Sequence, residues 1–266
     1  MKTRNLFMSG ILISSFLVYF ACQSLPAGLS GGASDEDMAK LGAQAFEELK
    51  KKTPASTDPA INAYVRCVAN AVLKVTDDPT GVKDWEIVVF QDPTANAFAL
   101  PGGKIGVHTG LLPVATNQDM LATVLGHEIG HVIKRHGATR MQGGGLLEKG
   151  VEVAGNMILG DSAYKEQAMA ALGMGVNYGV VMPFTRSQES QADLVGLDLM
   201  AKAGFNPGQS ILLWKNMSAL GGKKQPAFLS DHPSNENRIK DLQGAMPKAM
   251  QQMAAANAQG RTPNCR

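Results

Sequence analysis

The sequence predicts an α+β fold that is mainly helical and includes one small β-sheet. Long segments with apolar side chains three and four residues apart indicate helices, most clearly residues 117–136 and 185–203. Between residues 85 and 107, short runs rich in β-branched and aromatic side chains indicate strands. The chain has 266 residues, of which 44% are hydrophobic, and this is enough for one domain with a buried core.

The first residues have the pattern of a secretory signal. Lys2 and Arg4 precede an apolar run over residues 6–20. A basic start, an apolar stretch and a small residue before the cleavage point are typical of signal peptides. We therefore expect a signal peptide over residues 1–21. An uncleaved membrane anchor is the alternative, although the run is short for a membrane span.

Cys22 is a candidate lipidation site. The pair Ala21-Cys22 matches the end of a bacterial lipoprotein signal, whereas Tyr19 stands where leucine is usual. Gln23 is compatible with sorting to the outer membrane because it is not aspartate. We expect a lipid anchor at Cys22 that holds the protein in the periplasm at the outer membrane, followed by a small-residue linker over residues 22–34.

Charge and cysteine content restrict the partners. The formal charge is +2, and removal of the signal peptide leaves 23 basic and 23 acidic residues. Because no basic stripe is present, we expect no nucleic-acid partner. If Cys22 is acylated, Cys67 and Cys265 remain as an even pair in an oxidising compartment. We expect them to form a disulfide that ties the C-terminal tail, residues 249–266, to the first helices; two free thiols are the alternative.

The segment before the central motif predicts a scaffold and a sheet. Residues 34–52 and 58–75 have helical spacing, and residues 85–91, 96–100 and 104–107 read as strands. The last two strands flank a tight Pro101-Gly102-Gly103 turn. An exposed strand edge can bind an extended peptide through main-chain hydrogen bonds, and a plain hairpin is the alternative. The candidate edge residues are Asn96, Ala97, Phe98 and Ala99.

The motif that organises the chain is His127-Glu128-Ile129-Gly130-His131. On a helix, His127 and His131 project from one face, so their nitrogens can bind one zinc ion. Glu128 then lies beside the metal and can take a proton from the water that the metal activates. The alternative is a pair of buried histidines that only satisfy core hydrogen bonds. We expect His136, near the helix end, to be a cation that interacts with the helix dipole and not a ligand.

A second helix can complete the site. Thr185 and Gln188 form a capping pattern before residues 186–203. Glu189 and Asp193 are four residues apart and share one face of this helix, close to its N-terminus. A nearby cation would relieve their mutual repulsion, and a solvated acidic face is the alternative.

Four blocks in order resemble a known family. HEIGH is followed by ESQAD, and the stretches NAFALPGGKIGVHTGLL (96–112) and DHPSNENRI (231–239) complete the pattern. Together they resemble the HtpX-like and CAAX-prenyl-protease-like zinc endopeptidases (gluzincins), including soluble periplasmic members of the BepA and LoiP type. The resemblance implies a zincin-like metalloprotease fold over residues 35–248, with the sheet bordering the cleft. It implies one zinc ion per chain, bound by His127, His131 and Glu189, with Glu128 as general base.

The resemblance also places His232 near the metal, and two roles stay open. His232 could occupy the fourth metal position as a latch that displaces water, or it could stabilise the oxyanion. Arg238 lies one turn inside the last helix (about 234–246) and could pair with Glu189, Asp193 or Asp231, or act on the oxyanion. Residues 137–184 are rich in Gly, Ala and Met and could form a mobile cover over the cleft or an ordinary helical hairpin.

The expected function is therefore a zinc-dependent endopeptidase of the bacterial cell envelope. Its substrates would be extended or misfolded polypeptides, and by resemblance these are outer-membrane proteins. Two alternatives remain: a zinc-binding chaperone-like protein that holds unfolded clients, and a metallohydrolase of cell-wall or small amide substrates. Glu128 argues against the first because a structural zinc site needs no general base and usually has four protein ligands.

Overall fold

The computed structural model describes residues 34–143, 169–174, 182–219, 227–233 and 236–266. The expected signal peptide, the lipidation site at Cys22 and the linker up to residue 33 lie outside these residues, as does most of the expected cover over 137–184. In the part of the chain that is described, no helix combines the length and the apolar character that crossing a bilayer requires.

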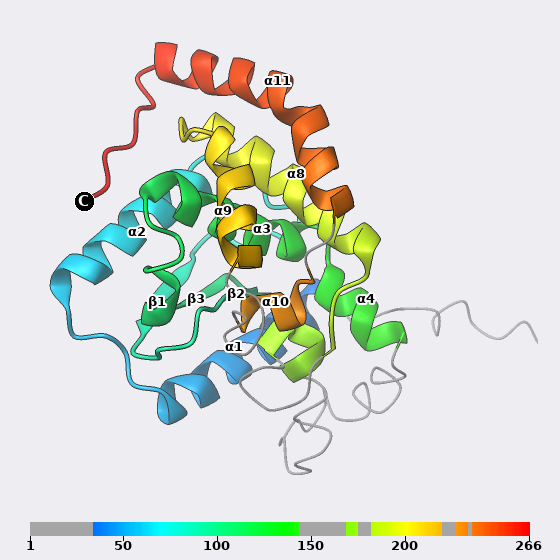
Figure 1. Ribbon diagram of the computed structural model, residues 1–266. Coiled ribbons are helices and arrows are strands. Elements are labelled where there is room, and N and C mark those ends of the chain that lie inside the picture. The colour runs from blue at the N-terminus through cyan, green and yellow to red at the C-terminus, as the bar shows by residue number, and fades with distance from the viewer. Residues whose placement is uncertain (1–33, 144–168, 175–181, 220–226, 234–235) are drawn as a thin grey trace, which may run out of the picture. The chain divides into compact units, whose positions relative to one another are not determined.

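The structure confirms the predicted α+β fold, with many helices around one small sheet (Figure 1). Four of the long helices begin at a residue whose side chain caps them, namely Ser34, Asp58, Asn117 and Thr185. For example, the Asp58 side chain accepts hydrogen bonds from Ala60 and Ile61 at the start of the second helix. The described helices are α1 (Asp35–Lys52), α2 (Pro59–Leu73), η1 (Thr109–Leu111), α3 (Gln118–Ile133), α4 (His136–Gly143), η2 (Ala170–Met174), α8 (Arg186–Lys202), α9 (Gly208–Ala219), α10 (Phe228–Asp231) and α11 (Glu236–Ala258).

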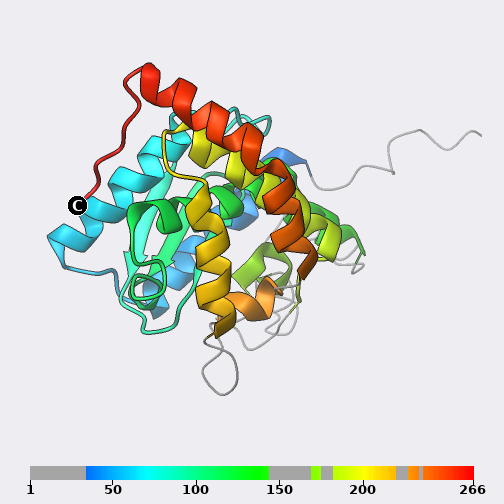
Figure 2. The same ribbon diagram turned by 45° about the horizontal axis from the view of Figure 1, so that its top comes forward.

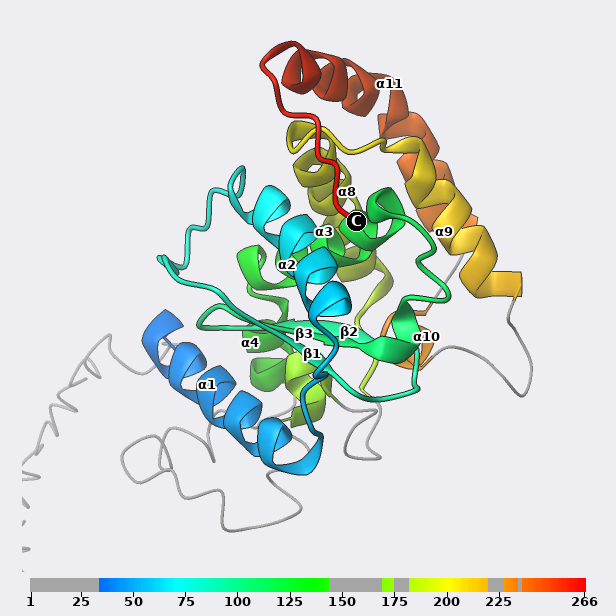
Figure 3. The same ribbon diagram turned by 90° about the vertical axis from the view of Figure 1, so that its left-hand side faces the viewer.

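The sheet has three strands in the order β1-β3-β2, with β3 (Lys104–His108) in the centre. β1 (Glu86–Phe90) pairs with β3 in parallel, and β2 (Ala97–Leu100) pairs with it antiparallel. Side chains alternate between two cores because successive residues of a strand face opposite sides. Ile87, Val89, Ala97, Ala99, Ile105 and Val107 face α2 and α3, whereas Phe90, Phe98 and Leu100 face α1 (Figure 3).

Two glycines let α3 and α8 approach closely. A Cβ atom on Gly126 would lie 2.9 Å from the Gly196 carbonyl oxygen, and one on Gly196 would lie 2.6 Å from the His127 nitrogen. These distances are too short for any side chain, so the two helices can touch here only because both residues are glycine. The contact fixes the distance between the two helices that carry the motif histidines and Glu189.

The last helix is longer than the sequence pattern indicates. α11 continues through Pro247 to Ala258, whereas the pattern indicated an end near residue 246. The added turns are rich in Ala, Gln and Met, which are strong helix formers, and Ala249 and Ala256 are buried. Propensity and burial together therefore outweigh the cost of an internal proline.

The C-terminal segment returns from the end of α11 to α2 (Figure 2). A disulfide joins Cys67 of α2 to Cys265, with 5.6 Å between their Cα atoms. The Gln118 side chain donates to the Pro263 carbonyl and accepts from the Cys265 amide. The tail is thus attached to α2 and to the first turn of α3.

Loss of this disulfide should destabilise the fold. The bond closes a loop with a sequence separation of 198 residues, so it restricts the unfolded chain strongly. We expect the paired substitution Cys67→Ser and Cys265→Ser to lower the free energy of unfolding by about 2–5 kcal/mol. Urea titration of both proteins measures this difference; coincident unfolding curves would contradict it.

Candidate metal centre

Four buried side chains from three segments form one cluster. His127 and His131 project from α3, Glu189 from the first turn of α8, and His232 follows α10 directly. All four side chains are at most 4% exposed. Each offers one ligand atom, and these atoms lie within 4.8 Å of one another. The structure therefore brings together the two motif histidines, one of the two candidate carboxylates and His232.

Helix caps determine where the helices that carry these side chains begin. Asn117 accepts hydrogen bonds from the Asp119 and Met120 amides at the start of α3. Thr185 and Gln188 form a reciprocal capping box at the start of α8, so the predicted cap is present. Because Glu189 follows within the first turn, the helix N-terminus favours its negative charge.

The distances fit a tetrahedral metal site. Nε2 of His127 lies 3.0 Å from Nε2 of His131 and 3.1 Å from Nδ1 of His232. Oε1 of Glu189 lies 3.0 Å from that Nδ1 and 3.5 Å from Nε2 of His131. Ligands about 2.0–2.1 Å from a central ion are about 3.3 Å apart at the corners of a tetrahedron. The observed separations are close to that value.

The chemistry of the donor set also suits a metal cation. The ring nitrogens of the three histidines point at one place: Nε2 of His127 lies 3.0 Å from Nε2 of His131 and 3.1 Å from Nδ1 of His232. A neutral imidazole has only one N–H to donate. Burial lowers the pKa of His131 well below its usual value, so its imidazole is neutral. Burial alone would raise the pKa of Glu189, but His232, His131 and His127 hold it far below its usual range. Imidazole nitrogens together with a carboxylate are a suitable donor set for a divalent metal ion.

Glu128 lies beside this cluster and is 3% exposed. Its Oε1 is 3.4 Å from Nε2 of His232, and its carboxylate accepts a hydrogen bond from the Ala99 amide of β2. Burial raises the pKa of Glu128 above its usual value, although His232 and His127 oppose this shift. A carboxylate with a raised pKa is better suited to take and return a proton near neutral pH.

A charged pair orients His127. Oδ1 of Asp193 lies 2.9 Å from Nδ1 of His127, which leaves Nε2 directed at the cluster. Arg238 donates to both oxygens of Asp193, from Nε at 2.6 Å and from a terminal nitrogen at 2.7 Å. Although burial raises the pKa of Asp193, Arg238 holds it below its usual range. Asp193 therefore remains ionised and fixes the imidazole, as carboxylates commonly do for metal-binding histidines.

Arg238 connects this pair to the rest of the site. A terminal nitrogen lies 2.6 Å from Oε2 of Glu189, and the guanidinium stacks on the ring of Trp214 with 3.8 Å to the centroid. It also donates to the Pro233 carbonyl at 3.2 Å. Of the partners that the sequence left open, the structure thus shows contacts of Arg238 with Glu189 and Asp193.

Two residues of the site were not found from the sequence. His136 was expected as a helix C-terminal cation, and this is wrong. It starts α4, is buried, and has a pKa lowered to about 4 by burial, so it is neutral. Its Nδ1 lies 2.9 Å from Nδ1 of His131, so it orients that ring. Phe184 covers His131 with 3.8 Å between ring centroids. In the sequence, the only indication that His136 lies beside His131 is that it follows the motif by five residues.

The candidate edge strand lies next to Glu128. In β2, Phe98 pairs with Gly106 of β3, and the Asn96 carbonyl accepts from the His108 amide. Alternate residues of an antiparallel strand point their main-chain groups to opposite sides. The main-chain groups of Ala97 and Ala99 therefore point to the other edge, which agrees with the hydrogen bond from Ala99 to Glu128. No strand pairs with that edge in the described part of the chain.

The family follows from comparison with known proteins. Residues 59–246 match the model of peptidase family M48, and the chain belongs to this family. This confirms the resemblance seen in the four sequence blocks and identifies the class of metal-dependent peptidases to which the fold and cluster belong.

Several curated proteins are similar to this chain. The mitochondrial metalloendopeptidase OMA1 of Schizosaccharomyces pombe is 36% identical over 190 residues, which cover 70% of this chain and 53% of that protein. OMA1 of Danio rerio is 32% identical over 235 residues, covering 83% and 48%. The beta-barrel assembly-enhancing protease of Yersinia pestis is 28% identical over 224 residues, covering 80% and 45%. The chain spans about half the length of the curated relatives it matches.

Proposed function

We propose that this protein is a zinc-dependent endopeptidase that cleaves extended polypeptides. One observation carries the proposal: a buried cluster with tetrahedral spacing adjoins Glu128, whose carboxylate is hydrogen-bonded to an edge strand. His127, His131 and Glu189 are the proposed zinc ligands. Zinc is favoured because imidazole and carboxylate donors at these spacings suit its tetrahedral geometry.

The mechanism uses residues of this chain around the scissile bond. A bound zinc ion polarises the scissile carbonyl and makes water more acidic. Glu128 accepts a proton from the attacking water as its oxygen bonds to the carbonyl carbon. Glu128 then gives that proton to the amide nitrogen as the carbon–nitrogen bond breaks. Asp193 and Arg238 keep His127 oriented throughout.

The substrate is proposed to lie along β2. The outward main-chain groups of Ala97 and the outward carbonyl of Ala99 can pair with an extended peptide, whatever its side chains. A site that binds a peptide through its main chain can accept unfolded proteins of many sequences. The beta-barrel assembly-enhancing protease among the relatives supports clients of the outer membrane, and the expected lipid anchor at Cys22 supports a periplasmic location at that membrane.

The ordinary test of this function is metal removal. Treatment with a chelator should abolish cleavage of unfolded casein and lower the melting temperature, because metal binding is linked to folding. Zinc at one equivalent per chain should restore both properties. A chelated protein that still cleaves casein would contradict the proposal. A protein that binds zinc and unfolded casein without cleaving it would instead support the chaperone-like alternative.

His232 is proposed to act as a latch. Its Nδ1 lies at the corner of the cluster that a catalytic site leaves open, 3.1 Å from Nε2 of His127 and 3.0 Å from Oε1 of Glu189. In this position it would exclude the attacking water, and substrate would have to displace it. The alternative, stabilisation of the oxyanion, requires it to leave this corner.

The two roles of His232 give opposite effects in a mutant. If the latch is closed in most molecules, we expect His232→Ala to retain zinc and to cleave unfolded casein roughly tenfold faster. Ser230→Ala on α10 is the matched control and should leave the rate unchanged. A zinc-loaded His232→Ala protein that is much slower than the parent would rule out the latch as the main role of this residue.

A further inference from the structure

The short helix α10 contacts the proposed substrate edge of β2. The amide of Phe228, the first residue of this helix, donates to the carbonyl of Ala95 at 3.0 Å. Ala95 lies two residues before Ala97, the first residue of β2. Because alternate residues direct their main-chain groups to the same side, the Ala95 carbonyl faces the same open edge as the carbonyls of Ala97 and Ala99. α10 therefore occupies an acceptor with which an extended peptide would pair.

Phe228 also supports His232. The Phe228 carbonyl accepts a hydrogen bond from the His232 amide at 2.9 Å. The Phe228 ring stacks on the imidazole, with 4.4 Å between ring centroids and 17° between ring planes. Both side chains are buried in a packed interior, where one ring cannot move far without the other. A displacement of the Phe228 main chain therefore also displaces His232.

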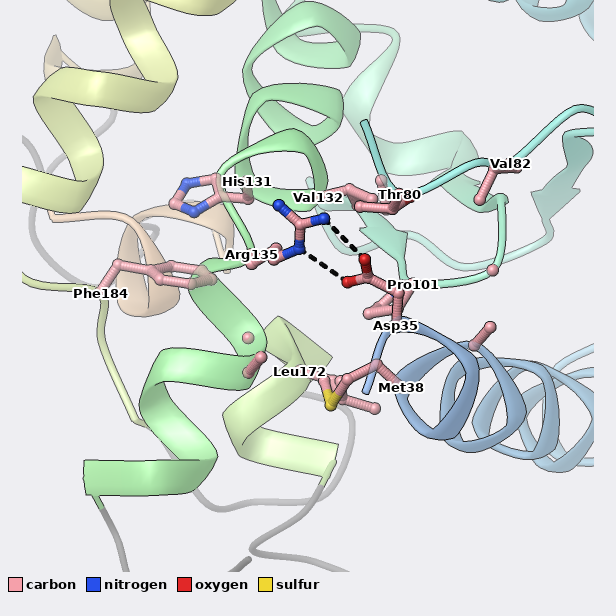
Figure 4. A pocket seen from close by; sticks show the side chains of 15 residues that line it. Asp35, Met38, Thr80, Val82, Pro101, His131, Val132, Arg135, Leu172 and Phe184 are labelled. Carbon is pink, nitrogen blue, oxygen red and sulfur yellow. Dashed lines mark hydrogen bonds and ion pairs between the residues drawn. The ribbon is translucent and has the colours of Figure 1, made fainter. Parts of the chain in front are cut away.

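Phe184 holds the other end of α10. Its amide donates to the Asp231 carbonyl at 3.1 Å, and its ring centroid lies 5.2 Å from that of His232. Figure 4 shows the Phe184 ring beside His131, and the Arg140 guanidinium lies 3.4 Å from the centroid of this ring. The C-terminal end of α10 is thus attached to a packed cluster, whereas its first residue is attached to an acceptor that a peptide also needs.

The length of β2 determines which peptides reach this acceptor. The Ala99 amide donates to Glu128, so Ala99 marks the catalytic end of the edge. Ala95 precedes Ala99 by four residues in the sequence, and this corresponds to about 13 Å along a strand. A peptide whose scissile bond lies at Glu128 therefore needs about four residues on one side of that bond to pair with Ala95.

We propose that an extended substrate opens the latch by displacing the Phe228 amide from the Ala95 carbonyl. This inference rests on the proposed endopeptidase function and on the latch role of His232, and it adds a minimum length for the substrate. A peptide N–H replaces the Phe228 N–H on the same carbonyl, so this acceptor stays satisfied while α10 shifts and moves His232 out of the cluster. A peptide that ends before Ala95 leaves α10 in place and meets a closed site.

Hydrogen exchange tests the movement of α10 directly. Zinc-loaded Glu128→Gln protein is used, so that casein peptides bind without being cleaved. We expect a long peptide to increase amide exchange over residues 227–233, because the bond that protects Phe228 is lost. A peptide with the same central sequence and at most three residues on either side of the scissile bond should leave this exchange unchanged.

The matched control is the long peptide with a single N-methyl group, placed at each residue in turn. The peptide that is methylated where it faces Ala95 lacks only the competing N–H, so it should leave the exchange of α10 unchanged. Unchanged exchange with every unmethylated long peptide would overturn the proposal.

Peptide length tests the effect on cleavage. Two series of peptides extend one casein-derived sequence residue by residue, one toward the N-terminus and one toward the C-terminus. In one series, kcat/KM of the parent should rise roughly tenfold between three and four residues, as the latch opens. Ser230→Ala on α10 is the control variant and should keep this step. His232→Ala should cleave the short peptides fast and lose the step. An equal step in the parent and in His232→Ala would overturn the coupling and leave the endopeptidase function standing.

Phe228→Leu separates the role of the ring from that of the amide. Leucine keeps the N–H that binds Ala95 but loses the stacking on His232, so short peptides should be cleaved several-fold faster than by the parent. This gain should be absent when Phe228→Leu is combined with His232→Ala, because the ring acts through His232. An equal gain in both backgrounds would contradict this positioning role. If the parent cleaves no peptide, the endopeptidase function fails, and the exchange of α10 still decides whether the edge of β2 controls His232.

Discussion

Glu128→Gln is expected to abolish proteolysis while the zinc content stays at the parent level. Glutamine has nearly the same shape as glutamate, so it can occupy the same buried space between His232 and β2. It cannot accept the proton of the attacking water. General acid–base catalysis is worth about 10²–10⁴-fold, and we expect a loss at the upper end because one group serves both proton transfers.

The measurement compares turnover of unfolded casein at equal zinc loading. Glu36→Gln, at an exposed site on α1, is the matched control and should keep the parent rate. Glu128→Gln should also keep the parent melting temperature within a few degrees, because the carboxylate is not among the proposed ligands. Near-normal cleavage by this protein would remove Glu128 from the mechanism.

Local patterns predicted the elements that carry the site. The spacing of apolar residues around His127 and His131 indicated the α3 helix, and both its Asn117 cap and the Thr185–Gln188 capping box are present. Short runs rich in β-branched and aromatic residues, together with the Pro101-Gly102-Gly103 turn, indicated the three strands. These features depend on interactions within a few residues, and such interactions can be read from a single sequence.

Features that depend on tertiary contacts could not be predicted from the sequence alone. The hydrogen bond of His136 to His131 requires the turn between α3 and α4, and the position of Phe184 requires its main-chain bond to Asp231. Parallel pairing of β1 with β3 joins strands that β2 separates in the sequence, so it is not a local feature. Asp193 and Glu189 looked equivalent in sequence, one turn apart on the same helix, and only the orientation of α8 against α3 distinguishes them.

The orientation of α8 against α3 leads to the second prediction with a large effect, which concerns the affinity for zinc. The oxygens of Glu189 lie 3.0–3.5 Å from ring nitrogens of all three histidines in the cluster. Those of Asp193 reach His127 only through Nδ1, the ring nitrogen that points away from the cluster. We therefore expect Glu189 to be a ligand and Asp193 to orient one.

Glu189→Ala should accordingly bind zinc more than about 100-fold more weakly than the parent, beyond the 10–100-fold range typical of orienting residues. Asp193→Asn should fall within that range, because an amide can still accept a hydrogen bond from His127. Asparagine is preferred to alanine here since Arg238 would otherwise be left buried beside an empty space. Competition with a chromophoric chelator measures both affinities. A greater loss for Asp193→Asn than for Glu189→Ala would exchange the two roles.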